Sequence, residues 1–172
     1  MGSQNTGNIT FASNSSLTGG IGLSDANRAT AVSHQGKGSI SFSSGATVNL
    51  TSADINSGSN ATIAISGGTF NLNNSSLISG KQNITVSDGE FEMQGGSFIR
   101  QTGDGNIAFS APEGSSSTSG IVFKATNGGI VHTGKEGSIT IQSGTYTFAS
   151  EDSGIFKGVD GTASSGSITV SG

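Results

Sequence analysis

The segment ATIAISGGTFNL (residues 61–72) contains the pattern that decides the fold. Two isoleucines flank an alanine, two glycines follow, and a phenylalanine and a leucine then flank an asparagine. Strict alternation of apolar and polar residues predicts strands, because successive side chains of a strand point to opposite faces. The Ser-Gly-Gly run between the two pairs predicts a turn.

The first part of this segment is one copy of a five-residue phrase that the chain repeats. Each copy has an isoleucine at its centre and an apolar residue two positions later. The copies are centred 21 to 32 residues apart, on Ile9, Ile40, Ile63, Ile84, Ile107, Ile139 and Ile168. Repeats of this length indicate one structural unit stacked on itself.

Each repeat contains three groups of apolar residues. In the two most regular repeats the third group is Leu77-Ile78 and Phe98-Ile99. The glycine-rich turns between the groups exclude a coiled coil. The sequence therefore predicts an all-β fold, a parallel β-solenoid of about six to seven triangular coils with about three short strands in each.

The ends and the longer repeats are less regular. We expect Met1-Gly2-Ser3 to be an expression scar and residues 4–172 to be one solenoid fragment of a longer repeat-containing protein. In the first repeat the strands are expected at Ile9/Phe11, Ile21/Leu23 and Ala31-Val32. The extra length of the long repeats predicts loops at Ser24–Gln35, Ala111–Ser119 and Gly158–Ser165, and such loops often bind partners.

The amino-acid composition of the chain restricts the kinds of partner and ligand that it is expected to bind. The 172-residue chain has no cysteine, only 10% charged residues and a net charge of -4. Neither disulfides nor thiolate metal sites are available. No apolar run is long enough to span a bilayer, so we expect no membrane insertion by this fragment. The slight acidity provides no electrostatic footprint for nucleic acid.

Two ranks of small residues are expected to point outward beside the repeated isoleucines. The first rank is Thr10, Ser41, Ala64, Thr85, Ala108, Thr140 and Thr169, and the second is Ala12, Ser43, Ser66, Ser87, Ser110, Gln142 and Ser171. A packed outer ladder is the simplest interpretation. A self-association or glycan-binding face is the main alternative. Ice binding is a third interpretation, although alanines and serines interrupt the threonines.

Charged residues suggest two further surfaces. A second face is expected to show Asn49, Asn71, Glu92, Val122 and Thr147, with Glu90 and Asp88 near Glu92. Paired carboxylates are used in glycoside hydrolysis, but a solvated strand is the favoured interpretation because no acidic cluster forms across neighbouring repeats.

A third face is expected to carry Arg100, His132 and Lys157, each just after an apolar pair. In register they would form a thin basic column able to contact sulfated or acidic glycans. Isolated solvated cations are the alternative. His34 and His132 lack metal-ligand spacing, and no catalytic set is apparent. We therefore assign no catalytic, cofactor-binding or metal residues, and expect a protein without cofactor or enzyme activity.

The phrases Gly/Asn-x-Ile-x-Phe/Ile/Val and the turn-strand at residues 66–72 resemble the right-handed β-helix passengers of Gram-negative surface adhesins. These are the autotransporter passengers and the filamentous-haemagglutinin-like exoproteins of two-partner secretion. The resemblance covers nearly the whole chain. It implies right-handed coiling, a secreted or outer-surface location, and a part in cell adhesion, biofilm or virulence.

The expected function is therefore a structural and adhesive module, a rigid stalk that binds or self-associates through its outer faces and loops. Its partners would be a host-surface or matrix glycan or protein, or another solenoid. The first alternative is a β-helix that binds or degrades polysaccharide, like a tailspike or lyase. The second alternative is an ice-binding solenoid.

Overall fold

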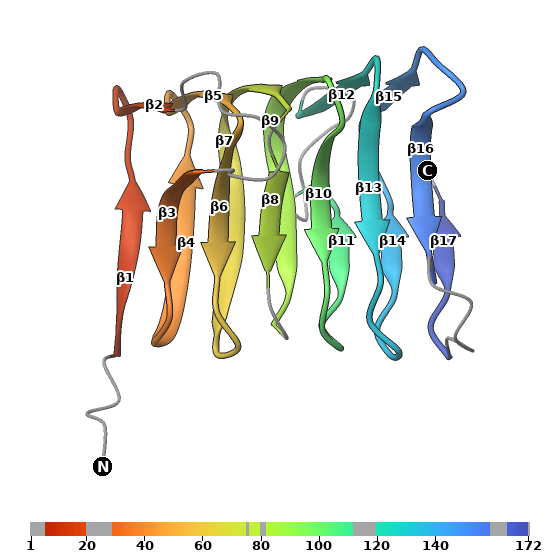
Figure 1. Cartoon of the computed structure of the whole chain (residues 1–172), viewed down its shortest axis with the longest axis horizontal. Coiled ribbons are helices and arrows are strands. Elements are labelled where there is room, and N and C mark those ends of the chain that lie inside the picture. The colour runs from red at the N-terminus through yellow and green to blue at the C-terminus, as the bar shows by residue number, and fades with distance from the viewer. Residues whose placement is uncertain are drawn as a thin grey trace.

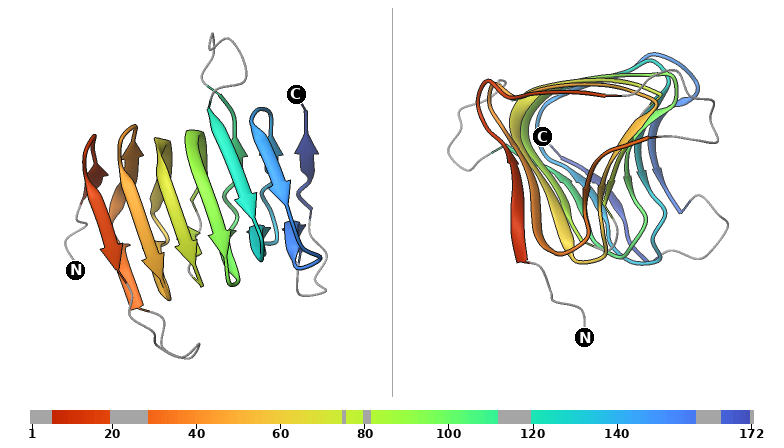
Figure 2. Two further views of the ribbon diagram at one scale, coloured as in Figure 1. Left: turned by 90° about the horizontal axis from the view of Figure 1, so that it is seen from above. Right: turned by 60° about the vertical axis from the view of Figure 1, so that its left-hand side comes forward.

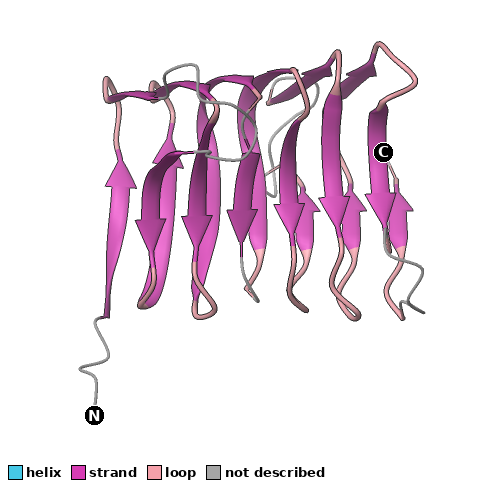
Figure 3. Cartoon of the chain, in the orientation of Figure 1, coloured by secondary structure: helices cyan, strands magenta, loops and turns pink. Residues whose placement is uncertain are grey.

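The computed structural model describes residues 6–19, 29–74, 76–79, 82–111, 120–158 and 165–171. In these ranges the chain forms strands and turns and contains no helix (Figure 3). The strands are β1 (Thr6–Phe11), β2 (Ser16–Gly19), β3 (Ala29–His34), β4 (Lys37–Ser43), β5 (Thr47–Thr51), β6 (Ala53–Ser57), β7 (Ala61–Asn73), β8 (Ser76–Ser79), β9 (Ile84–Gln94), β10 (Ser97–Gln101), β11 (Ile107–Phe109), β12 (Ile121–Ala125), β13 (Gly128–His132), β14 (Ile139–Ile141), β15 (Thr145–Phe148), β16 (Ser153–Lys157) and β17 (Ile168–Val170).

The repeated isoleucine phrases lie side by side in one stack of parallel strands, β1-β4-β7-β9-β11-β14-β17 (Figure 1). We name this stack the isoleucine face. Each central isoleucine is paired with the next, from Ile9 opposite Ile40 to Ile139 opposite Ile168. The predicted stacking of the phrases is therefore confirmed.

A second stack branches from the first because β7 and β9 are long enough to contribute to both. It contains β2, β5, residues 69–73 of β7, residues 90–94 of β9, β12 and β15, and we name it the branch face. The register between β7 and β9 shifts near Ser66, where the chain passes from one stack to the other. Gly68 in this passage has a φ of 111°, which favours glycine.

The first repeat departs from its prediction on the branch face. Leu17 of β2 is the residue that pairs with Val48, whereas the strand was expected at Ile21 and Leu23. Those two residues lie outside the described ranges. Strand β2 was not predicted, because Leu17 is a single apolar residue among small polar ones and no alternating pair marks it.

The third stack is a separate sheet with the order β16-β13-β10-β8-β6-β3, which we name the second sheet. The strand predicted at Ala31-Val32 is confirmed as β3 (Ala29–His34), and the loop predicted at Ser24–Gln35 is therefore wrong over these residues. Most of the other two predicted loops, residues 112–119 and 159–164, lies outside the described part of the chain.

The corner between the branch face and the second sheet is built from left-handed residues. Ser52 has a φ of 53° and Asn74 a φ of 49°. The side-chain amide of Asn74 donates a hydrogen bond to Oγ of Ser52, at 3.2 Å. Asparagine adopts this backbone conformation more readily than most residues, which explains its frequency at the turns of this chain.

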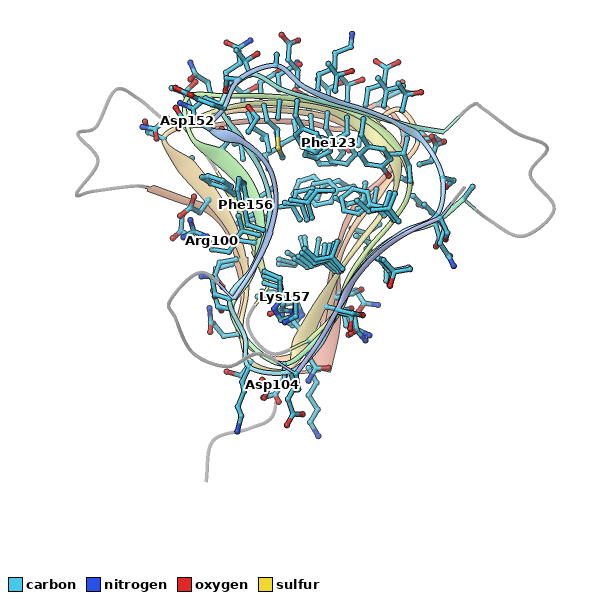
Figure 4. The ribbon with its side chains drawn as sticks, turned by 90° about the vertical axis from the view of Figure 1, so that its right-hand side faces the viewer. Arg100, Asp104, Phe123, Asp152, Phe156 and Lys157 are labelled. Carbon is cyan, nitrogen blue, oxygen red and sulfur yellow. The ribbon has the colours of Figure 1, made fainter. Side chains whose placement is uncertain are left out.

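The three stacks face one another (Figure 2), and their inward apolar side chains form one core (Figure 4). Aromatic rings follow one another through it: Phe70 and Phe91 stack with ring centroids 4.8 Å apart, and Phe91 lies 5.7 Å from Phe123. Fully burying an isoleucine or phenylalanine contributes about 1.5–3 kcal/mol, so a strand is stabilised mainly by the strands on either side of it. Parallel strands around a shared core are consistent with a β-solenoid.

Candidate functional site

The first outward rank of the isoleucine face is in register from end to end. Thr10 lies opposite Ser41, Thr85 opposite Ala108, and Thr140 opposite Thr169. These side chains are exposed or half-buried, while in the middle of the stack the residues on either side of each are buried in the core. The rank is thus a flat strip of small side chains, interrupted by Ala64 and Ala108 as the sequence indicates.

Three serines of the second rank are hydrogen-bonded within the fold through their hydroxyl groups. Oγ of Ser43 donates to the carbonyl of Phe11 at 3.2 Å, and Oγ of Ser66 donates to the carbonyl of Phe42 at 3.1 Å. The hydroxyl of Ser87 donates to the carbonyl of Ile65 at 3.4 Å. Each serine therefore bonds the strand of the preceding repeat, which supports the packed-ladder interpretation of this rank.

A third outward set, which the sequence analysis missed, lies just before each central isoleucine. Oδ1 of Asn83 accepts the backbone N–H of Asn106 at 2.8 Å, and Oδ1 of Asn106 accepts that of Ser138 at 2.8 Å. Oδ1 of Asn8 accepts the backbone N–H of Ser39 in the same way, at 3.0 Å. The asparagine in the repeated phrase was the signal, since a side-chain amide can continue a backbone ladder where a strand begins.

The branch face carries a shallow polar groove of about 330 Å³. Its floor is an amide ladder in which Nδ2 of Asn71 donates to Oδ1 of Asn49 at 2.7 Å. Gln94 donates to the carboxylate of Glu92 at 2.9 Å. Because these polar groups already bond one another, they are poorly suited to hold a ligand.

Val122 points outward on the branch face as predicted, but it is not the neighbour of Glu92. Lys124 lies opposite Glu92 and Thr147, whereas Val122 lies opposite Glu90. Ile121 and Phe123 are buried as predicted, and Ala125 is a third inward residue of β12 that was not recognised as apolar core. Glu92 therefore has a lysine beside it, and Glu90 has a valine. No second carboxylate is brought to either from β12.

The predicted basic column does not form. Arg100 lies opposite Val131, while His132 lies opposite Gln101 and Lys157. His132 is fully buried, and Lys157 lies on the inner side of the ribbon, whereas Asp104 lies outside it (Figure 4). The residue after each apolar pair was predicted to point outward. This prediction is wrong for His132 and Lys157, because only one member of each apolar pair points inward and in their pairs it is the first.

The side chains of His132 and Lys157 instead form hydrogen bonds to backbone carbonyl groups at the inner corner of the fold. Nε2 of His132 lies 2.7 Å from the carbonyl oxygen of Gly105, and Nζ of Lys157 donates to the carbonyl of Gly134 at 3.4 Å. His34 contacts the carbonyl of Gly7 with the same geometry, at 2.7 Å. Nδ1 of His132 is buried without a hydrogen-bond partner in the described residues, and burial lowers the pKa of His132.

The most distinctive surface is a hollow of about 620 Å³ on the outside of the second sheet. Phe98, Val131 and Phe156 form its apolar part, and Arg100 stands among them with its guanidinium carbon 5.4 Å from the Phe98 ring centroid. The polar or small residues that complete its lining are Gly96, Asn127, Thr133, Glu151 and Asp152. Figure 4 shows Asp152, Phe156 and Arg100 along one flank of the ribbon.

Two negative findings apply to the described residues alone. No group of three or more histidine, cysteine, aspartate or glutamate side chains is placed to hold a metal ion. None of these residues belongs to a helix long and apolar enough to cross a membrane.

Comparison of the chain with protein-family models, with curated proteins and with solved structures found no match.

Proposed function

We propose that this chain is a structural and adhesive module of a secreted or cell-surface bacterial protein. In this proposal the strands form a right-handed β-solenoid of about six to seven triangular coils, each with about three short strands. The column acts as a rigid stalk, and its outer surfaces bind a host-surface or matrix glycan or protein, or a second solenoid.

The observation that carries the proposal is the unbroken register of the seven central isoleucines. Each phrase pairs in parallel with the next one in the chain, with no strand of another stack inserted between them. The second sheet follows the same sequence order, from β3 to β16. A chain that winds repeatedly around one axis produces this order, whereas a globular sheet rarely does.

A stack of this kind suits a stalk for a physical reason. Each strand is hydrogen-bonded along its length to the strands before and after it, and its inward side chains pack against theirs. Bending the stalk would break many of these contacts at once. Weak contacts repeated along a rigid surface would also add to one another, because binding at one repeat raises the effective concentration at the next.

The shape is tested by small-angle X-ray scattering and by electron microscopy of the purified chain. We expect an elongated particle whose long axis corresponds to about 4.8 Å for each stacked strand. A compact spherical particle would contradict the solenoid. A density map that resolves the strands also gives the handedness, and left-handed winding would remove the support of the adhesin resemblance.

The adhesive role is tested by sedimentation velocity over a wide concentration range, and by binding of the labelled chain to immobilised matrix proteins and to a glycan array. Concentration-dependent association, or saturable binding to one surface, supports the proposal. A chain that stays monomeric and binds none of these surfaces would leave only the stalk.

Polysaccharide binding is the second candidate, and the hollow on the second sheet favours it. Aromatic and charged side chains lining one open cavity are the usual components of a small-ligand site. Incubation with pectin, capsule and O-antigen polysaccharides, followed by size analysis of the products, distinguishes binding from degradation.

A further inference from the structure

We propose that the hollow on the second sheet is a binding site for a neutral oligosaccharide, with Phe156 as the stacking platform and Arg100 as the central hydrogen-bond donor. This inference rests on the polysaccharide-binding part of the proposed function. It names the site and the class of sugar.

The shape of the hollow follows from the register of three neighbouring strands. In β10, β13 and β16 one outward column is Phe98, Gly129 and Gly154, and the next is Arg100, Val131 and Phe156. Gly154 leaves room for the ring of Phe156, because a Cβ atom at Gly154 would lie 3.1 Å from Cζ of that ring. The ring therefore lies over this glycine, and the hollow is lined by Phe156 and Val131 together with the side chains of Phe98 and Arg100.

Gly129 is required at its position for backbone reasons. Its φ is 150°, and a Cβ atom there would collide with the carbonyl oxygen of Gly154. Neighbouring Gly128 has a φ of 129°, and its Cβ would collide with the carbonyl oxygen of Ser97. The backbones of β10, β13 and β16 approach one another too closely at these points for side chains.

Phe156 supplies an exposed aromatic surface. Its side chain is 38% exposed, and it is the one exposed aromatic residue of the described ranges, because the other exposed large hydrophobic residues are Ile168 and Val170. The apolar C–H face of a pyranose ring packs on such a surface, while the hydroxyl groups around the ring remain free to hydrogen-bond.

Arg100 supplies a donor that lacks a partner. Its Nε atom is buried, and no hydrogen bond to it exists among the described residues. The guanidinium is held over the Phe98 ring, an arrangement that restricts its position. A buried donor without an acceptor is uncommon in native proteins. Because Nε itself is closed to a water-sized atom, a ligand oxygen in the hollow would accept from the outer nitrogens of this half-buried guanidinium.

The rim determines which ligand fits. Glu151 and Asp152 line the hollow together with the single guanidinium of Arg100, so carboxylates outnumber the cation. A carboxylated or sulfated sugar would bring its anion toward these carboxylates, on a chain whose net charge is already -4. A neutral sugar avoids this repulsion, and its hydroxyl groups donate to the carboxylates while its oxygens accept from Arg100.

The test is a titration of the ¹⁵N-labelled chain with maltohexaose, cellohexaose and chitohexaose, each followed by heteronuclear NMR. We expect at least one of these probes to shift the amides of residues 96–100, 127–133 and 151–156 and to leave those of the branch face unchanged. Absence of shifts with all three sugars at millimolar concentration would overturn the proposal.

Three substitutions identify the groups that bind. Phe156→Ala and Arg100→Gln should each weaken the affinity about tenfold or more, as truncation of a central aromatic or arginine contact commonly does. Asp152→Asn should weaken it less. The matched controls are Glu92→Gln and Lys124→Gln on the branch face, which should leave the affinity unchanged. Preserved amide spectra away from the hollow establish that each variant is folded.

Competing ligands provide the remaining outcomes. If hexagalacturonate or a lysine hexapeptide shifts the same amides and binds more tightly than every neutral sugar, the proposed ligand class is wrong.

A second comparison separates this site from the adhesive function. If the wild-type chain adheres to matrix or glycan surfaces and Phe156→Ala adheres equally well, the hollow is not the adhesive site, while the adhesive function is still supported. A chain that fails on all surfaces yet binds a neutral hexasaccharide through Phe156 would remove the adhesive proposal and keep this one.

Discussion

The isoleucine face and the second sheet are both stacks of parallel strands, but they differ in how much their side chains vary along the stack. On the isoleucine face the central inward residue is isoleucine at every level, and the outward residues are small. In the second sheet the last residue of β6, β10, β13 and β16 points inward but differs from strand to strand: it is Ser57, Gln101, His132 and Lys157 in turn. The outward residues of this sheet also vary, and they include glycine, phenylalanine and arginine.

This difference separates two roles within one fold. A column of identical side chains packs in the same way at every level, so it maintains the register. A column whose side chains differ from strand to strand adds little to the register. Its residues can instead form hydrogen bonds and cavities that are found at a single position in the stack.

The largest effect is expected in the uniform column. Ile84 is fully buried between Ile63 and Ile107, so Ile84→Ala should lower the free energy of unfolding by about 2–5 kcal/mol. Ile168 occupies the same place in the phrase but is 44% exposed, so Ile168→Ala should cost less than about 1 kcal/mol. Urea unfolding followed by circular dichroism measures both, and equal losses would contradict the stacking argument.

The next effect concerns the backbone of the second sheet. Gly129→Ala should lower the free energy of unfolding by at least about 1–3 kcal/mol, because it combines an unfavourable φ with a collision. The control is Gly96→Ala, since Gly96 has a φ of 76° and a Cβ atom there would meet no other atom within 4 Å. Gly96→Ala should therefore show only the smaller conformational cost. A Gly129→Ala variant as stable as wild type would show that the strands can separate without loss.

A pH-dependent effect is expected from the polar inner corner. Desolvation holds the pKa of His132 below its ordinary value of 6.5 in the folded chain, and Lys157 also lowers it, whereas the contact with Gly105 and the charge of Asp104 raise it. The unfolded chain therefore binds a proton more readily than the folded one. Stability should fall as the pH drops below about 6.5 and level off below the folded-state pKa.

The comparison of wild type with His132→Gln tests this pH effect. Thermal melting at a series of pH values between about 7.5 and 4.5, the range over which histidine titrates, should show a smaller loss for the variant. Glutamine is the residue at the equivalent position of the preceding repeat, Gln101, where it is buried. Equal pH dependence of the two proteins would assign the loss to carboxylates instead.

The smallest effect is expected on the exterior of the isoleucine face. Ser66→Ala removes the hydrogen bond to the carbonyl of Phe42 and should cost about 0.5–1.5 kcal/mol. Ala64→Ser places a hydroxyl in the neighbouring rank and should leave the stability within about 0.5 kcal/mol of wild type. Urea unfolding measures both variants. If Ser66→Ala costs nothing, the serine rank is not part of the ladder and remains available for binding.

Sequence patterns predicted the uniform region well because alternation is informative when both inward residues are large. Ile63 with Ile65, and Phe70 with Leu72, were assigned inward and are buried. The same reasoning failed where one inward residue is small or isolated. Ala125 was overlooked beside Phe123, so Val122 was assigned to the position beside Glu92 that Lys124 occupies. Leu17 was overlooked in the first repeat, so strand β2 was not predicted.

The candidate site was only partly predictable for a related reason. Arg100 was selected as a surface cation, and the register places it in the hollow, but the sequence analysis grouped it with His132 and Lys157. In Phe98-Ile99 the inward isoleucine comes second, whereas in Ile130-Val131 it comes first. Adjacent apolar residues do not reveal which of them faces the core, and an error of one residue reverses every side chain of a strand.

The all-β character of this chain and the pairing of its isoleucine phrases follow from alternation and repetition, which can be read in the sequence. The contacts between particular residues of neighbouring repeats were not predictable in this way and follow from the folded arrangement of the strands. Phe156 lines the hollow beside Val131 because the two residues are opposite each other in register. His132 is buried because it points to the same side of its strand as Ile130. Those contacts depend on the register between strands that are about 25–30 residues apart in the chain. The pattern within one repeat does not specify its register against the next repeat.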